Sequence, residues 1–378
     1  MDYKGHDPFD LPNSLFFKFI PFNWYYLQLL VSKFGSRIAP DWLRKLLLVP
    51  LIEDPKTYSC SYFSYLLNGE DSNSNEMIKR LLSISKKDEI GIYWGYDFNW
   101  PTLDGTTNKK GDSTIVPGSF AMLALSVESI LKNDEKLNLQ LISSANYYIS
   151  KHLLYNQFKQ PFIGYFKHSI SNTHNANLLG CASMTLVFTI FEDKEKLKLL
   201  AECAKTSIDE IDETGYIPYK DSKDGMWTDC FHHLYVIASL RMLLELNPYI
   251  DKDIYQIKIN LLENFYKNTF FREDGLINYY KNNQYPIDPH NYAVTSIYNI
   301  LFLNNNKFAI SLLEKIDSLT WSKNEGRYFH RINKFGKIDK RKFTRWGQVW
   351  MLLAFSVVKN EDKLKEIIIQ IQQKLTKK

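Results

Sequence analysis

Side chains capable of proton transfer or ligand binding recur at the predicted starts of successive helices in this chain. Each group follows a loop that contains glycine and aromatic residues, and the last four loops begin at Gly164, Gly215, Gly275 and Gly326. A spacing of about 50 to 60 residues is the scale at which internal repeats set an architecture. If the helix starts meet at one end of the molecule, their polar groups form a single pocket, as expected of an enzyme.

Four ionisable side chains in these groups are the candidates for general acid–base chemistry. They are Asp229, His232, Asp288 and His290. Each alone has an ordinary structural explanation, because Asp288 followed by Pro289 is a typical helix N-cap and a lone histidine is usually a hydrogen-bonded core residue. Capping does not explain why histidines gather in the first turns of several helices.

Other residues at the helix starts are suited to binding a sugar. Aromatic faces stack on the C–H face of a pyranose ring, and amides and imidazoles bond its hydroxyls. Helix N-termini present unpaired N–H groups and partial positive charge, which favours an anionic ligand held by arginine. The predicted substrate-binding residues are Trp94, Trp100, Trp227, Trp346 and Tyr219 for stacking, His174, Asn175, Asn177 and Gln348 for hydrogen bonds, and Arg345 for the anion.

Helical periodicity predicts the elements that position these groups. Residues 120–130 and 234–244 are apolar around most of a helix circumference, as expected for inner helices buried on most sides. Charged amphipathic helices alternate with them. These outer helices are predicted at 134–154, 193–211, 251–270, 308–319 and 361–375, and a less regular pair is predicted at 57–67 and 73–86.

Six such pairs predict an all-α fold, an (α/α)6 toroid of six inner and six outer helices with short β-hairpin loops. We expect one toroid domain over residues 56–378 and an N-terminal extension, residues 1–55, packed on it. An open solenoid of helix pairs is the alternative, but a solenoid does not require polar groups at the same end of each inner helix.

Composition excludes several other functions. The net charge is +5 and the lysines are scattered without an arginine-rich stripe, so we expect no nucleic-acid partner. The histidines at the helix starts lie on different repeats without metal-ligand spacing, and glycine-rich phosphate loops are absent from the sequence. We therefore expect neither a metal nor a cofactor.

The cysteines and the N-terminal segment bear on the compartment. Four cysteines far apart in sequence favour buried free thiols in a reducing compartment, and the acidic N-terminus does not resemble a signal peptide, so we expect a cytoplasmic protein. Residues 15–31 are apolar and aromatic but are interrupted by polar residues, which disfavours a membrane-spanning helix. Packing on the toroid is the main interpretation, and peripheral membrane contact is the minor one.

Four of the helix starts carry a resemblance to a known family. In order, the motifs are His174-Asn175-Ala176-Asn177-Leu178-Leu179-Gly180, Trp227-Thr228-Asp229-Cys230-Phe231-His232, Tyr285-Pro286-Ile287-Asp288-Pro289-His290 and Arg345-Trp346-Gly347-Gln348-Val349-Trp350. They resemble a bacterial and archaeal family of (α/α)6 proteins of surface-polysaccharide biosynthesis, often described as glycoside-hydrolase-like. The segment from Asp7 to Ser14 is similar as well. More distantly, the chain resembles unsaturated uronide hydrolases, polysaccharide lyases and N-acylglucosamine epimerases.

Three functions remain open from the sequence. The leading hypothesis is a carbohydrate-active, glycoside-hydrolase-like enzyme of cell-surface polysaccharide metabolism that acts on an anionic sugar, with Asp229 and Asp288 as the carboxylate pair. The second is an epimerase or lyase in which His232 and His290 exchange a proton with a sugar carbon. The third is a non-catalytic glycan-binding or scaffold protein that works with partners in a polysaccharide synthesis complex.

Overall fold

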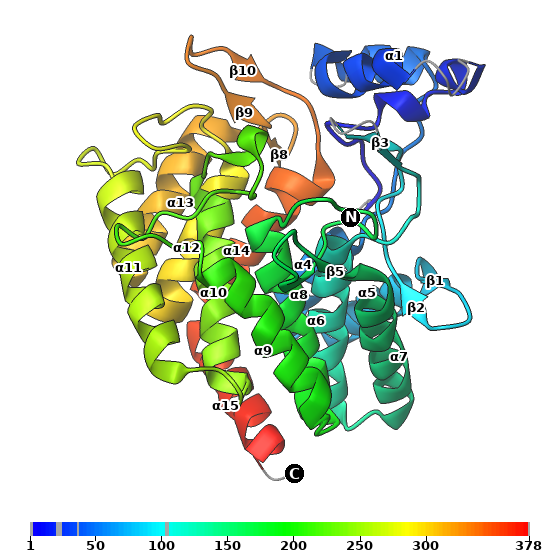
Figure 1. Ribbon diagram of the computed structural model, residues 1–378. Coiled ribbons are helices and arrows are strands. Elements are labelled where there is room, and N and C mark those ends of the chain that lie inside the picture. The colour runs from blue at the N-terminus through cyan, green and yellow to red at the C-terminus, as the bar shows by residue number, and fades with distance from the viewer. Residues whose placement is uncertain (1–2, 20–24, 36–37, 103–105, 377–378) are drawn as a thin grey trace.

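The computed structural model describes residues 3–19, 25–35, 38–102 and 106–376, and twelve of its helices form six nested pairs (Figure 1). Each inner helix contacts the next, and α14 contacts α4, so the inner ring is closed. This closure confirms the predicted (α/α)6 toroid and excludes the open solenoid. The inner helices are α4 (Pro55–Asn68), α6 (Ile115–Lys132), α8 (His174–Ile190), α10 (Cys230–Leu246), α12 (Pro289–Leu303) and α14 (Val349–Lys359).

The outer helices pack in turn against the inner helices that precede them in the chain. They are α5 (Asp71–Ser83), α7 (Glu135–His152), α9 (Lys194–Ile208), α11 (Lys252–Phe270), α13 (Asn306–Thr320) and α15 (Glu361–Thr376). Asp134, Asp193 and Asp251 cap α7, α9 and α11 through their carboxylates. The acidic residues that marked these helices in the sequence therefore satisfy backbone N–H groups at the helix starts.

Short antiparallel two-stranded hairpins lie in the loops between the helices, as predicted. The pairs are β1 (Lys86–Lys87) with β2 (Ile92–Tyr93), β3 (Trp100–Pro101) with β4 (Thr107–Asn108), β5 (Leu153–Tyr155) with β6 (Pro161–Ile163), β7 (Trp321–Ser322) with β8 (Arg327–Tyr328), and β9 (Arg331–Ile332) with β10 (Ile338–Asp339). A π-helical turn over Thr344–Gln348 leads into α14.

The glycine-aromatic loops join neighbouring inner helices at one rim of the ring. The first N–H of an inner helix donates to a tyrosine carbonyl in the loop that precedes the next inner helix. These bonds run from Ile115 to Tyr165 (3.1 Å), from His174 to Tyr219 (3.1 Å) and from Cys230 to Tyr279 (3.0 Å). Helices α4 and α12 instead begin with Pro55 and Pro289, which have no N–H to satisfy. The repeated loops therefore hold the inner-helix starts side by side.

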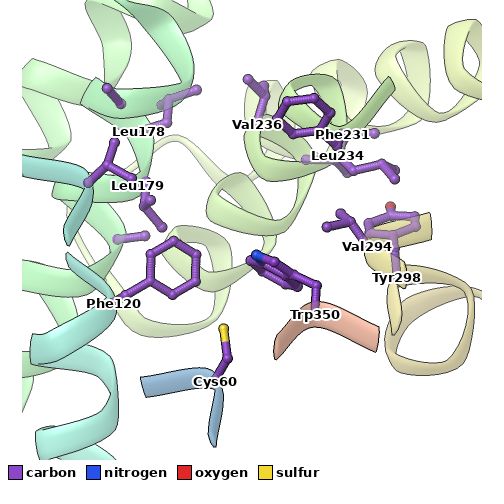
Figure 2. Packing of buried hydrophobic residues seen from close by; sticks show 14 of the residues in the cluster. Cys60, Phe120, Leu178, Leu179, Phe231, Leu234, Val236, Val294, Tyr298 and Trp350 are labelled. Carbon is purple, nitrogen blue, oxygen red and sulfur yellow. The ribbon is translucent and has the colours of Figure 1, made fainter. Parts of the chain in front are cut away.

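Aromatic side chains close the axis of the ring beneath this rim (Figure 2). The rings of Phe120 and Trp350 meet edge to face with centroids 5.7 Å apart, and Tyr235 lies 5.9 Å from Trp350. Figure 2 shows Cys60 of α4 beside this pair. All four cysteines are buried and unpaired, which confirms the prediction of free thiols. The axis is thus filled by packed aromatic side chains.

Among the described helices, α6 is long and apolar enough to pass a composition test for a membrane span, with a mean hydropathy of 1.4 over 18 residues. In the ring, 83% of that window is buried against neighbouring helices. Its apolar character is accounted for by its inner position.

The N-terminal extension crosses the rim and is tied to the ring closure. It contains short helical turns at Leu11–Asn13 and Leu15–Phe19, followed by α1 (Tyr25–Leu30), a π-helical turn at Val31–Gly35 and α3 (Asp41–Leu46). Its Asp7 carboxylate pairs with the Arg345 guanidinium, and both side chains are buried. Asp54, the N-cap of α4, lies 3.9 Å from the same guanidinium. One arginine therefore links the extension, the first inner helix and the start of the last.

We expect Arg345→Gln to lower the free energy of unfolding by about 3–5 kcal/mol, because it removes the directly paired cation of the buried Asp7 carboxylate and leaves Asp7 and Asp54 with the Lys56 ammonium alone. Urea denaturation followed by circular dichroism measures this. Arg272→Gln is the matched control, since its pair with Asp274 lies at the surface and should contribute less than about 1 kcal/mol.

Adding Asp7→Asn to Arg345→Gln should restore part of the lost stability, because it removes one of the stranded charges. Equal losses for the two arginine variants would contradict this account of the ring closure.

Candidate active site

Two adjoining pockets open at the rim. The aromatic pocket, of about 640 Å³, is lined by Trp100, Tyr165, Phe166 and Tyr219 among others. The basic pocket, of about 940 Å³, is lined by residues that include Asp229, His232, Arg327, His330 and Arg331. Phe9 of the extension and Trp227 line both. The inner-helix starts and the extension thus enclose one continuous bowl with two lobes.

Asp229 and His232 form a dyad in the wall of the basic pocket. Asp229 caps α10, with Oδ1 accepting from the His232 backbone N–H at 2.9 Å and Oδ2 lying 2.8 Å from His232 Nδ1. The Asp229 side chain is buried, whereas 22% of the His232 side chain is exposed. The carboxylate favours the tautomer with hydrogen on Nδ1, which leaves Nε2 as a proton acceptor. The dyad thus presents a basic nitrogen whose orientation is fixed from behind.

Asp288 and Arg331 form a second pair beside the dyad. Asp288 caps α12, with Oδ1 accepting from the His290 N–H at 3.0 Å and Oδ2 accepting from Arg331 Nε at 2.9 Å. Burial raises the pKa of Asp288, while Arg331 opposes that shift and Asp229 adds to it. The Arg331 guanidinium lies 5.8 Å from the Tyr279 ring and lines the pocket. It supplies positive charge to the same pocket that His232 lines.

His290 lies behind the pocket wall. Its ring contacts Phe231 and Trp346, which do line the basic pocket, and its Nε2 is 3.0 Å from the Tyr235 hydroxyl. Nδ1 is buried and has no hydrogen-bond partner among the residues that the structure describes. Burial lowers the pKa of His290 well below 6.5, so the imidazole is neutral.

The β7–β10 hairpins add a cationic wall. Arg327 bonds Glu325 through Nε at 2.6 Å, while its Nη1 is buried with no hydrogen-bond partner. Lys337 and Lys340 line the same wall and are exposed. A carboxylate or phosphate on a ligand would find donors here.

The predicted stacking residues divide between the pockets and the core. Tyr219 and Trp227 stack with centroids 4.5 Å apart and planes 8° apart, and Trp100 stacks on Phe9 at 4.8 Å. Trp346 lines the basic pocket. Trp94 does not join them, because its indole is buried and donates to the Leu81 carbonyl at 2.8 Å.

The predicted hydrogen-bonding residues lie outside both pockets. Asn177 donates to the Cys203 carbonyl and to Ser207 Oγ, and His174 Nδ1 is 3.1 Å from the same hydroxyl, so both side chains tie α8 to α9. Asn175 is buried beside them in the first turn of α8. Gln348 bonds the backbone N–H and carbonyl of Tyr328 and thereby holds β8.

Arg345 also occupies a different place from the one expected. Its guanidinium lies against the Tyr96 and Trp346 rings and is paired with Asp7. A ligand anion would have to displace a buried carboxylate to reach it. The helix-start N–H groups, expected to face an anion, are likewise engaged by the loop carbonyls and the aspartate caps.

Sequence reasoning missed Arg331, His330 and Lys56. The first two lie at the β9 hairpin after the last glycine-aromatic loop, where the sequence predicted only a short β-hairpin loop. Lys56 follows the Asp54-Pro55 helix start, and its ammonium lies 5.5–5.8 Å from the ring centroids of Phe120, Trp346 and Trp350. Burial lowers the pKa of Lys56 to about 8. The cap-proline pattern seen at Asp288-Pro289 was the signal that could have identified this helix start.

Comparisons with known proteins show what the fold is similar to. No protein-family model matches the chain, and no curated protein matches it either. Among solved structures, a cellobiose 2-epimerase from Bacillus thermoamylovorans B4167 superposes with a TM-score of 0.64 at 11% identity, covering 83% of this chain and 90% of that one. A possible member of the GH105 family from Salmonella enterica superposes with a TM-score of 0.59 at 11% identity, covering 83% of this chain and 86% of that one. A D-mannose isomerase superposes with a TM-score of 0.55 at 14% identity, covering 80% of this chain and 86% of that one. At these identities the likeness establishes the shared toroid.

We expect stability to fall as the pH drops from about 6.5 to about 4. Burial lowers the pKa of His152, His174 and His233 from 6.5 to about 4. Between these values the unfolded chain binds more protons than the folded one, so lowering the pH favours unfolding, by up to about 3 kcal/mol per histidine. Above pH 6.5 this contribution is fully present.

Urea denaturation from pH 8 to pH 4 measures the slope, and His152→Gln tests its origin. The glutamine amide can replace the bonds of His152 to the Gly164 carbonyl and the Ser113 hydroxyl but does not titrate. The variant should therefore lose less stability on acidification than the parent. Parallel curves for the two proteins would exclude His152 as a contributor.

Proposed function

We propose that the protein is a carbohydrate-active enzyme that epimerises or isomerises an anionic aldose in the basic pocket, with His232 as the proton-transfer group. The observation that carries this proposal is the Asp229–His232 dyad. Of the four predicted catalytic side chains, His232 alone combines exposure to the pocket with a ring nitrogen that has no hydrogen-bond partner among the described residues. Asp229, Asp288 and His290 are buried.

The chemistry needs only proton transfer. In an open-chain aldose the C–H next to the aldehyde carbon is acidic, because the electrons left behind delocalise onto the carbonyl oxygen as an enediolate. His232 Nε2 takes that proton, and the Arg331 guanidinium stabilises the developing negative charge. Return of a proton to the opposite face of the same carbon gives the epimer, whereas its delivery to the neighbouring carbon gives the ketose. No oxidant or reductant is consumed.

His330 is the second histidine that lines the pocket. Burial and the nearby Arg331 lower its pKa well below 6.5, so it is neutral, and its Nδ1 is buried without a hydrogen-bond partner. A neutral imidazole has no readily released proton, so the proton that returns to the opposite face of the sugar carbon comes from solvent, and His330 forms part of the pocket wall. The Tyr219–Trp227 stack then offers a flat surface for the rest of the saccharide, and Arg327 with its lysine neighbours favours a substrate that carries a carboxylate or phosphate.

The comparisons support a sugar substrate, since a cellobiose 2-epimerase and a D-mannose isomerase share this fold. Fold alone does not fix the reaction, so the preference for proton transfer comes from the site. Hydrolysis by a carboxylate pair has less support. Each oxygen of Asp229 and Asp288 already accepts a hydrogen bond, and both side chains are buried.

We expect His232→Asn to lower kcat by about 10²–10⁴, the usual contribution of a general base. The assay incubates a panel of neutral and uronic aldoses with enzyme in D₂O and follows deuterium at the carbon next to the carbonyl by NMR. Asp229→Asn should also slow the exchange, because the imidazole loses the carboxylate that orients it. His174→Gln is the matched control outside the pockets and should retain the parent rate.

The same samples separate the competing functions. Release of new reducing ends without deuterium uptake would show that the protein hydrolyses the sugar and does not epimerise it. Asp288→Asn would then test whether Asp288 is a catalytic carboxylate. Saccharide binding with neither reaction across the panel would favour a binding protein.

A further inference from the structure

The pocket mouth is rimmed by apolar side chains that point to solvent. On one side, Ile38, Trp42 and Leu46 of the extension are 79%, 65% and 65% exposed. On the other side, Phe335 at the tip of the β9–β10 hairpin is 82% exposed, and Ile338 follows it. Large exposed apolar groups concentrated in one place usually mark an interaction surface. We call these five residues the apolar rim.

The two sides belong to one face of the molecule although about 290 residues separate them in the chain. Ile38 and Trp42 line the basic pocket together with Ile338. Figure 1 shows the extension and the β9–β10 hairpin projecting at the same end of the ring, away from the C-terminal end of α15. Three residues of the apolar rim therefore line the candidate active site from two sides, and Leu46 and Phe335 lie on the same two segments.

The exposure is not a by-product of folding the extension. Leu11, Val31, Ala39 and Val49 form a small core of their own, against which Leu43 and Leu47 pack. In α3 the inward side chains thus complete this core, while Trp42 and Leu46 on the other face contribute nothing to it. Their outward position leaves them available for a partner.

Charge identifies the partner. Residues 38–51 and 329–343 together contain eight Lys and Arg and two Asp. With Asp10 and Asp288 included, which pair with Arg44 and Arg331, the net charge is +4, whereas the whole chain has +5. Lys45, Lys334, Lys337, Lys340 and Lys342 are all exposed. The remainder of the chain is thus nearly neutral, and its excess positive charge is concentrated beside the apolar rim. Exposed aromatic and aliphatic groups interleaved with lysines match the interface of an anionic bilayer, which offers an apolar layer under negative headgroups.

We propose that the protein docks its pocket mouth on an anionic lipid bilayer, with Trp42 and Phe335 entering the interface and the surrounding lysines contacting the headgroups. Docking in this orientation turns the basic pocket toward the membrane. The inference rests on the apolar rim and the lysines beside it and holds whichever reaction the pocket performs.

Co-sedimentation of the full-length protein with lipid vesicles tests the proposal. We expect binding to vesicles of phosphatidylcholine with phosphatidylglycerol, little binding to phosphatidylcholine alone, and weaker binding as salt is raised. The double variant Trp42→Ser/Phe335→Ser should lower the partition coefficient about tenfold or more, because it removes the inserting groups. The charge variant Lys45→Glu/Lys334→Glu should reduce the preference for the anionic vesicles.

Matched substitutions away from the rim serve as controls. Leu139→Ser and Lys136→Glu change an exposed leucine and an exposed lysine of outer helix α7, and both should leave binding unchanged. Light scattering of the protein without vesicles measures its oligomeric state and so tests the competing explanation, that the apolar rim is an interface between two copies of the chain. The proposal is overturned by absence of vesicle binding, by an equal loss for Leu139→Ser, or by rim substitutions that dissociate a dimer without affecting vesicle binding.

Discussion

The buried contact of Arg345 with Asp7 and Asp54 is the constraint on which the rest of the molecule depends. A toroid made of helix pairs must join its last inner helix to its first, and the two segments that meet there are far apart in the chain. Arg345 at the start of the last inner helix and Asp54 at the start of the first lie 3.9 Å apart, and Asp7 brings the extension to the same point. These charges are buried, and both carboxylates interact with the Arg345 guanidinium and, more weakly, with the buried Lys56 ammonium. The same contact therefore joins the ends of the ring and holds the extension at the rim.

Two of the catalytic candidates, Asp229 and Asp288, each have a structural role and a role in the candidate site. Asp229 and Asp288 satisfy the helix-start N–H groups with one oxygen and orient a pocket residue, His232 or Arg331, with the other. The choice between capping and chemistry that the sequence posed thus has no single answer. A carboxylate has two oxygens, and at these positions the fold uses one while the site uses the second.

Most of the architecture could be predicted from the sequence because each helix is determined by residues that are close together in the chain. Helical periodicity, aspartate caps and repeated glycine-aromatic loops each act within a few residues, and together they specified twelve helices and a common rim. Side-chain partners across the ring were not predictable in this way. Arg345 was expected to meet a ligand, but its partner Asp7 is 338 residues away in sequence. His174 and Asn177 looked like binding residues, yet both meet Ser207 on the outer layer. Arg331 was missed because the strand pattern of its hairpin gives no indication of which helix start it faces.

The hydrogen bonds between loop carbonyls and the first helix N–H groups have a consequence for how such a scaffold diversifies. These bonds join main-chain atoms only, so we expect the inner-helix starts to keep their positions when the side chains at the rim are exchanged. The cations of the pocket come largely from the hairpins of the last repeat, which are anchored at both ends and contribute little to the axial core. If the pocket binds a ligand as proposed, a different hairpin between the same two anchor points would change the cations that face the ligand and leave the helices of the toroid in place.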